Sequence, residues 1–238
     1  MTSNKLKIIA CLTMAADHVG FLLLPDVMLL RYIGRIAFPL FAFFIAEGCL
    51  HTRSKIKYFL EILAMAVACQ LFYLGEAVIN GSIHSMYLNI LFTFSLSITI
   101  CSAYLRLANS VRSKNKRQIE LNVTFFAASL GFSVFCCTCL SWLCGIPVTV
   151  DYSMAGVLLP ISALIFTDKK KRLIAFSAGT LLYCLVWSFA RPYVWFALLS
   201  LPLLALYNGK RGSKKLKWVF YFFYPAHFAL IYGIGLFI

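Results

Sequence analysis

Long apolar runs fill most of the chain, and short polar segments separate them. A helix needs about 20 apolar residues to cross the hydrocarbon core of a bilayer, and none of the runs alternates with the period of two that barrel strands require. The pattern therefore predicts an all-α, polytopic integral membrane bundle of about nine transmembrane helices, with seven as the lower bound because two runs are short. The predicted spans are 6–24, 28–50, 57–79, 86–108, 121–144, 152–167, 172–190, 192–207 and 217–238.

Composition excludes most other classes of protein. Hydrophobic residues make up 62% of the 238 positions and charged residues only 13%, about half the charged share of a soluble domain. A soluble chain of this length could not bury that much apolar surface, and a disordered or fibrous chain would not contain it. We expect a single transmembrane domain over residues 1–238.

The basic residues carry information about topology. Lys and Arg number 22 against eight Asp and Glu, a formal net charge of +14. With the N-terminus in the cytoplasm, nine alternating spans place nineteen of the 22 in short cytoplasmic loops, which is the positive-inside bias. The pattern predicts an N-in, C-out topology, and the loops could serve only to orient the protein and contact anionic lipid. No basic, aromatic-interleaved region outside the spans indicates nucleic-acid binding.

The nine cysteines all lie within or at the ends of predicted spans. An odd number of cysteines inside a membrane does not form a disulfide framework, and no histidine lies near the group at 136–144 to complete a metal site. We interpret the cysteines as small packing residues and expect no metal.

Charged side chains inside two predicted spans require an explanation. A charge near the bilayer centre costs at least about 2.5–3.5 kcal/mol, yet the first span contains Asp17 and His18 and the second contains Arg31 and Arg35. The two arginines are four residues apart and share a helical face. Pro39 has no N–H, so the carbonyl of Arg35 loses its helical partner. The second span therefore has a polar, kinked centre that must face protein or a water-filled cavity.

Further polar residues occur in other spans. Glu47 lies further along the second span, Asn89 and Thr93 share a face of the fourth, and Tyr224 and His227 share a face of the ninth. One interior cavity could satisfy all of them. For His227 alone, a hydrogen-bonded core histidine and a functional histidine are both consistent with the sequence.

Two interpretations of Asp17, His18 and Arg35 remain open. They could form a structural ion-pair cluster, since buried carboxylates and guanidinium groups pair to offset desolvation. They could instead be catalytic, because histidine accepts and returns protons near neutral pH. Neighbours on a helix point about 100° apart, so Asp17 could hold Arg31 or Arg35 rather than His18.

Several blocks resemble the TraX family. They occur in order along almost the whole chain, at residues 7–20, 30–43, 47–53, 88–93, 206–212 and 223–227. The resemblance implies a bacterial cytoplasmic (inner) membrane location and an activity like the N-terminal acetylation of conjugative pilin. The family is also similar to the wider group of transmembrane acyltransferases, which show a basic residue eleven positions before a histidine in the first span. Lys7 and His18 are eleven residues apart here, which is about 16 Å along one helical face.

The sequence and this resemblance together suggest a membrane acyltransferase. It would move an acetyl or other acyl group from cytoplasmic acetyl-CoA (acyl-CoA) to an amine or hydroxyl acceptor on a protein, peptide, glycan or lipid. His18 would be the general base or a transient acyl carrier, and Asp17 would orient or charge-balance the site. Arg35 would position the substrate or stabilise the oxyanion. We expect acceptor contacts from Arg31, Glu47, Asn89, Tyr224 and His227, and contacts to the CoA phosphates from Lys7, Arg53, Lys210 and Arg211.

Two other classes also fit the buried charges. Broken spans and intramembrane ionisable groups mark the pathways of transporters and channels for a small solute or a proton, although no internal two-fold repeat is evident. A purely structural membrane partner would need Asp17, His18 and Arg35 only for stability.

Overall fold

A computed structural model describes residues 1–79, 86–213 and 216–235. The described chain is mostly helical, as predicted, and four of its segments are long and apolar enough to cross a membrane: Met28–His51, Lys55–Gly75, Ile90–Arg112 and Lys116–Thr138. The count of nine crossings and the N-in, C-out topology stay predictions, and the last three residues of the expected span 217–238 lie outside the described residues.

Packing divides the chain into two compact units. The terminal unit comprises residues 1–44 and 166–238, and the central unit comprises residues 45–165. The terminal unit is therefore built from both ends of the chain. The prediction of one domain over residues 1–238 stays a prediction.

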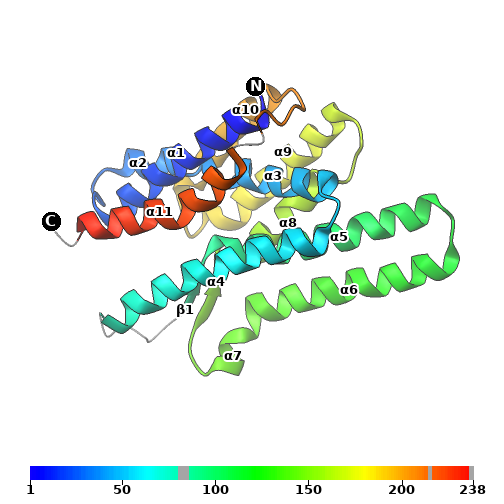
Figure 1. Cartoon of the computed structure of the whole chain (residues 1–238), viewed down its shortest axis with the longest axis horizontal. Helices are drawn as coiled ribbons and strands as arrows, with labels where there is room; N and C mark the ends of the chain where they lie inside the picture. The colour runs from blue at the N-terminus through cyan, green and yellow to red at the C-terminus, as the bar shows by residue number, and fades with distance from the viewer. Residues whose placement is uncertain (80–85, 214–215, 236–238) are drawn as a thin grey trace. The chain divides into compact units, whose positions relative to one another are not determined.

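Helix α1 (Ser3–Leu22) is the central helix of the terminal unit. It packs against α2 (Met28–Gly34) and against α11 (Lys217–Gly235), and Figure 1 shows α1 and α11 running side by side in the same direction. The remaining elements of this unit are the first half of α3 (Ala37–His51), α9 (Lys169–Ser188), the 3-10 helix η1 (Pro192–Leu199) and α10 (Ser200–Ala205).

The predicted kink before Pro39 is confirmed. Helix α2 ends at Gly34, and the N–H groups of Arg35 and Ile36 donate to carbonyls three residues earlier, those of Tyr32 and Ile33, before α3 begins. Tightened turns of this kind are typical where a helix is interrupted. The break leaves Arg35 at the junction between the two helices.

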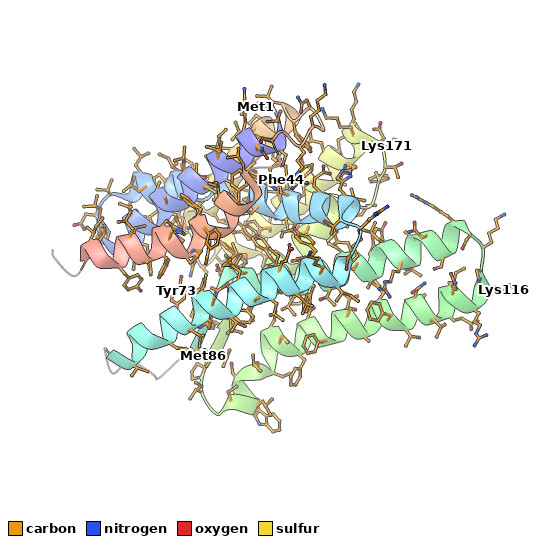
Figure 2. All side chains as sticks on the ribbon, in the orientation of Figure 1. Met1, Phe44, Tyr73, Met86, Lys116 and Lys171 are labelled. Carbon is orange, nitrogen blue, oxygen red and sulfur yellow. The ribbon has the colours of Figure 1, made fainter. Side chains whose placement is uncertain are left out.

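The central unit is organised around α5 (Ile90–Arg112). It packs against α4 (Lys55–Ile79), α6 (Lys116–Thr138) and α8 (Ser153–Ser162), and Figure 2 shows Lys116 at the tip where α5 turns back into α6. The hydroxyl groups of Thr93 and Ser97 donate to the carbonyls of Asp151 and Val157. These polar residues of the fourth predicted span thus find their partners within the central unit.

The prediction of a helix starting at residue 86 is wrong by four residues. Met86–Leu88 forms strand β1, which pairs in parallel with β2 (Val148–Val150), and α7 (Leu140–Cys144) precedes β2. The apolar run continues through these residues, so hydropathy could not separate the strand from the helix. The helix begins after Asn89, whose side-chain oxygen accepts a hydrogen bond from Leu91 N–H, as an N-cap does.

The two short predicted spans are short in the structure too. Residues 152–167 contain α8, a helix of ten residues, and residues 192–207 contain η1 followed by α10. A straight crossing needs about 20 helical residues, so a full crossing by either segment stays a prediction.

Candidate functional site

Asp17 binds both arginines of the second predicted span. Its Oδ1 lies 3.1 Å from Arg31 Nη1, and its Oδ2 accepts a hydrogen bond from Arg35 Nη2. Arg31 Nη1 also donates to the backbone carbonyl of Asp17 at 3.1 Å. Arg35 is only 4% exposed, whereas Arg31 and Asp17 are partly buried, at 13% and 15% exposed. Two guanidinium groups on one carboxylate leave the cluster with a formal surplus of one positive charge.

An aromatic ring from η1 completes the cluster. The guanidinium carbons of Arg31 and Arg35 lie 5.9 Å and 5.5 Å from the ring centroid of Tyr193, and Arg31 lies 5.0 Å from the ring of Phe21. Cations over aromatic faces are stabilised by the ring quadrupole. No sequence pattern indicated Tyr193, because its contact depends on how η1 packs against α2.

His18 contacts a second histidine rather than the ion cluster. Its Nδ1 lies 2.8 Å from Nε2 of His227 on α11, and the ring centroids are 4.9 Å apart. Nδ1 of His227 lies 2.8 Å from the backbone carbonyl of Phe223. His227 is 6% exposed and His18 is partly buried, and the two rings form one hydrogen-bonded chain that ends at the Phe223 carbonyl.

Aromatic rings of α11 enclose the histidine pair. The ring of Phe223 stacks on His227 with an interplanar angle of 10°, and Tyr224 meets His227 edge-on. Phe228 meets His18 edge-on at 5.3 Å. Tyr224 and His227 therefore lie together, as their spacing predicted.

The two clusters lie on different sides of α1. Asp17 and His18 are consecutive residues, so their side chains point about 100° apart, and they face α2 and α11 respectively. The expectation that Asp17 holds an arginine rather than His18 is confirmed, and it holds two.

The turn at 207–213 closes the N-terminal end of α1. The carbonyls of Lys210 and Arg211 accept hydrogen bonds from the backbone N–H groups of Ser3 and Asn4, and Asn4 Nδ2 donates to Ser213 O at 2.7 Å. Gly209 and Gly212 supply positive φ angles of 77° and 85°, which glycine adopts without strain. The backbone of the turn is used for helix capping, and the side chains of Lys210 and Arg211 are exposed.

Lys7 and His18 face the same neighbouring helix. Lys7 Nζ lies 5.7 Å from the ring of Phe220 on α11 and 5.3 Å from the ring of Phe44, whereas His18 contacts His227 on α11. Since α1 is continuous over both residues, the two positions are about 16 Å apart along one face. Lys7, near the N-terminal end of α1, and His18, near its C-terminal end, thus both lie along the contact between α1 and α11.

Three residues of the expected site belong to the central unit. Glu47 forms an ion pair with His51 at 3.6 Å, and Arg53 is exposed in the turn between α3 and α4. The Asn89 amide nitrogen donates to the carbonyl of Ala66 and to Gln70 Oε1, while its oxygen caps α5. The substrate roles expected for Glu47 and Asn89 and the phosphate role of Arg53 stay predictions.

Four segments are long and apolar enough to cross a bilayer, which defines the class of a membrane protein. Its terminal unit contains a histidine pair between α1 and α11 and an ion cluster between α1 and the two arginines. The family model described as "TraX protein" matches residues 2–235. The chain therefore belongs to the TraX family, and the resemblance seen in the sequence is confirmed.

A similar protein from Dichelobacter nodosus is named a probable fimbrial assembly protein, FimC of serogroup H1. It is 29% identical over 265 aligned residues, which cover 98% of this chain and 96% of that protein. An uncharacterized protein from Rickettsia prowazekii (strain Madrid E) is 49% identical over 39 residues, 16% of each chain. No solved structure matches the chain.

Proposed function

We propose that this protein is a membrane acyltransferase that moves an acetyl group from cytoplasmic acetyl-CoA to an amine or hydroxyl acceptor at or beyond the membrane. The observation that carries the proposal is the contact between His18 and His227. An imidazole is the side chain best suited to take a proton from an acceptor near neutral pH. The His18 imidazole is hydrogen-bonded to the imidazole of His227, in a chain that is 62% hydrophobic.

The ion cluster supports the same chemistry. Attack on a thioester develops negative charge on the carbonyl oxygen, which fixed cationic donors stabilise. Arg31 and Arg35 share one carboxylate, so their surplus positive charge would favour an oxyanion. Asp17 would hold both guanidinium groups in place, and Arg31 would contact the acceptor.

The N-terminal end of α1 has basic residues suited to binding the acyl donor, acetyl-CoA. The exposed Lys210 and Arg211 lie on the turn that caps α1, and Lys7 lies one turn further along the helix. Cationic side chains bind phosphate strongly, so these residues would hold the CoA phosphates while the thioester extends toward His18.

The family supports an acceptor on the cell surface. The Dichelobacter nodosus relative is named for fimbrial assembly. We propose that this protein lies in the bacterial inner membrane and that it acetylates the terminus of a pilin-like protein. Peptides, glycans and lipid headgroups offer the same amine and hydroxyl chemistry.

Mass spectrometry of envelope proteins and polymers, from cells with and without this gene, tests the proposal. We expect a gain of one acetyl group on a specific acceptor, and its loss in cells that express the His18→Ala variant. The exposed His51, 75% accessible in the central unit, provides the matched control: His51→Ala should retain acetylation. Full acetylation in the His18→Ala cells would remove His18 from the mechanism, and identical envelopes with and without the gene would reject the proposed activity.

A further inference from the structure

The hydrogen bonds of the histidine pair specify where its protons lie. Phe223 contributes a backbone carbonyl, which can only accept, so Nδ1 of His227 must carry a proton. A neutral imidazole has one N–H and one lone pair, so Nε2 of His227 is an acceptor. The atom opposite it, Nδ1 of His18, must therefore be the donor.

This order leaves the lone pair of His18 on Nε2. Among the described residues, Nδ1 makes the single hydrogen bond of the His18 ring. The chain of donors thus runs from His18 Nδ1–H to His227 Nε2, and from His227 Nδ1–H to the Phe223 carbonyl. A histidine held by a hydrogen bond at one nitrogen presents the other nitrogen in a fixed tautomer.

The surroundings of His227 hold it in this orientation. The stacked ring of Phe223 and the edge-on rings of Tyr224 and Phe228 leave the imidazole 6% exposed. Phe223 lies one helical turn before His227, so the same segment of α11 supplies both the ring contact and the carbonyl. His227 needs no group from outside α11 to fix its own tautomer.

Resting on the proposed acyl transfer, we infer that His227 is a positioning residue that fixes His18 in the Nδ1–H tautomer, so that His18 Nε2 is the basic atom. The acceptor amine or hydroxyl gives its proton to His18 Nε2 while its nitrogen or oxygen forms a bond to the thioester carbonyl. The bond from carbon to sulfur breaks, and the proton passes from His18 to the CoA thiolate, which leaves as the thiol.

His227 also contributes to the charged intermediate of this step. Once His18 Nε2 is protonated, the Nδ1 proton of His18 can transfer to His227 Nε2 along the hydrogen bond, whose two nitrogen atoms are 2.8 Å apart. The positive charge is then shared by two rings, and the Phe223 carbonyl stabilises the His227 cation. Asp17, the carboxylate next to His18 in sequence, is directed toward Arg31 on α2 and toward Arg35 just after α2.

Nitrogen NMR of histidine-labelled protein in lipid nanodiscs tests the tautomer without reference to turnover. The chain has four histidines, and the signals that disappear in a His18→Gln variant are those of His18. We expect His18 to carry its proton on Nδ1 in the wild-type protein. A wild-type His18 with its proton on Nε2 would overturn the inference.

Two substitutions at His227 test the positioning role. In His227→Gln the amide oxygen can still accept from His18 Nδ1–H, so we expect the tautomer to persist and most of kcat to be retained. In His227→Phe the aromatic packing persists but the acceptor is lost, so we expect His18 to shift to the Nε2–H tautomer and kcat to fall about tenfold or more, with an unchanged KM for acetyl-CoA.

The outcomes separate this inference from the proposed function. Wild-type kcat in His227→Phe, or a kcat as low in His227→Gln as in His227→Phe, would overturn the positioning role while acetyl transfer stands. A wild-type protein with the Nδ1–H tautomer and no acetyl transfer to any envelope acceptor would instead reject the proposed function. Should His227→Phe fail to fold, the wild-type spectrum and the His227→Gln variant still decide.

Discussion

Gly34 on α2 packs so closely against Asp17 on α1 that a Cβ atom added to Gly34 would lie 2.3 Å from both Cβ and Oδ1 of Asp17. The ion cluster therefore depends on the absence of a side chain at position 34. Gly20 on α1 has a similar role, because an added Cβ there would lie 2.7 Å from Leu30 Cβ. Two glycines allow the first two helices to approach closely enough for Asp17 to bind both arginines.

The first prediction concerns this close contact. Gly34→Ala should lower the free energy of unfolding by about 1–3 kcal/mol, because the new methyl group must displace Asp17 or separate the helices. Thermal unfolding of the detergent-solubilised protein measures the change. Gly131→Ala in the interior of α6 is the control, since no atom lies within 4 Å of the added Cβ, and the better helix propensity of alanine should leave stability equal or higher. Equal stability of Gly34→Ala and the wild type would contradict the contact.

The second prediction concerns charge balance in the cluster. Asp17→Asn leaves Arg31 and Arg35 without their carboxylate, and breaking a buried ion pair in this way should cost about 3 kcal/mol. The double variant Asp17→Asn with Arg31→Gln restores the net charge of the cluster and should recover part of that loss. Thermal midpoints of the wild type, both single variants and the double variant give the coupling free energy. A double variant no more stable than Asp17→Asn would show that charge is not the cause.

The third prediction tests Asn89 as a structural residue. Asn89→Ala removes the cap of α5 together with the hydrogen bonds to Ala66 and Gln70, so we expect a loss of about 2 kcal/mol of unfolding free energy. Asn115 caps α6 through Gln118 N–H in an exposed turn, and Asn115→Ala should cost about half as much. If Asn89→Ala kept wild-type stability and lost only activity, its main role would be the substrate contact expected from the sequence.

The fourth prediction concerns the donor. Replacing both Lys210 and Arg211 by Glu should weaken acetyl-CoA binding about tenfold or more, since each charge-assisted contact to phosphate contributes about 1.5–3 kcal/mol. The double replacement of Lys170 and Lys171 by Glu changes the charge of the chain equally at another exposed basic segment and should leave affinity nearly unchanged. Isothermal titration with the protein in nanodiscs measures both. Equal dissociation constants for the two double variants would exclude the turn at 207–213 from CoA binding.

Local patterns predicted part of this site from the sequence. The spacing of Arg31 and Arg35 indicated a shared face, and the position of Pro39 predicted the break between α2 and α3 at which Arg35 lies. Lys7 and His18 also lie on one face of α1, as their eleven-residue spacing predicted, because a continuous helix converts sequence spacing directly into distance. These features depend only on residues within about three turns of each other in the same helix or at its end.

Contacts between residues far apart in the sequence could not be predicted from local patterns. His227 lies 209 residues after His18, and the sequence allowed it to be either a core or a site residue. Tyr193 approaches the arginines from η1, a segment predicted only as a short span. Met86–Leu88 looked like the start of a helix because a buried strand and a buried helix are both apolar. Each of these depends on which elements become neighbours, and no local pattern encodes that.

The assembly of the terminal unit from both ends of the chain has a consequence for biosynthesis. His227 lies 209 positions after His18, so synthesis from the first to the second histidine takes roughly 10–40 s at 5–20 residues per second. Until α11 inserts, the first helix holds an imidazole with no partner to orient it, and its first N–H groups wait for the carbonyls of Lys210 and Arg211. The contact between His18 and His227 is thus formed only after α11 has been synthesised, and a chain that stops before α11 lacks the partner of His18.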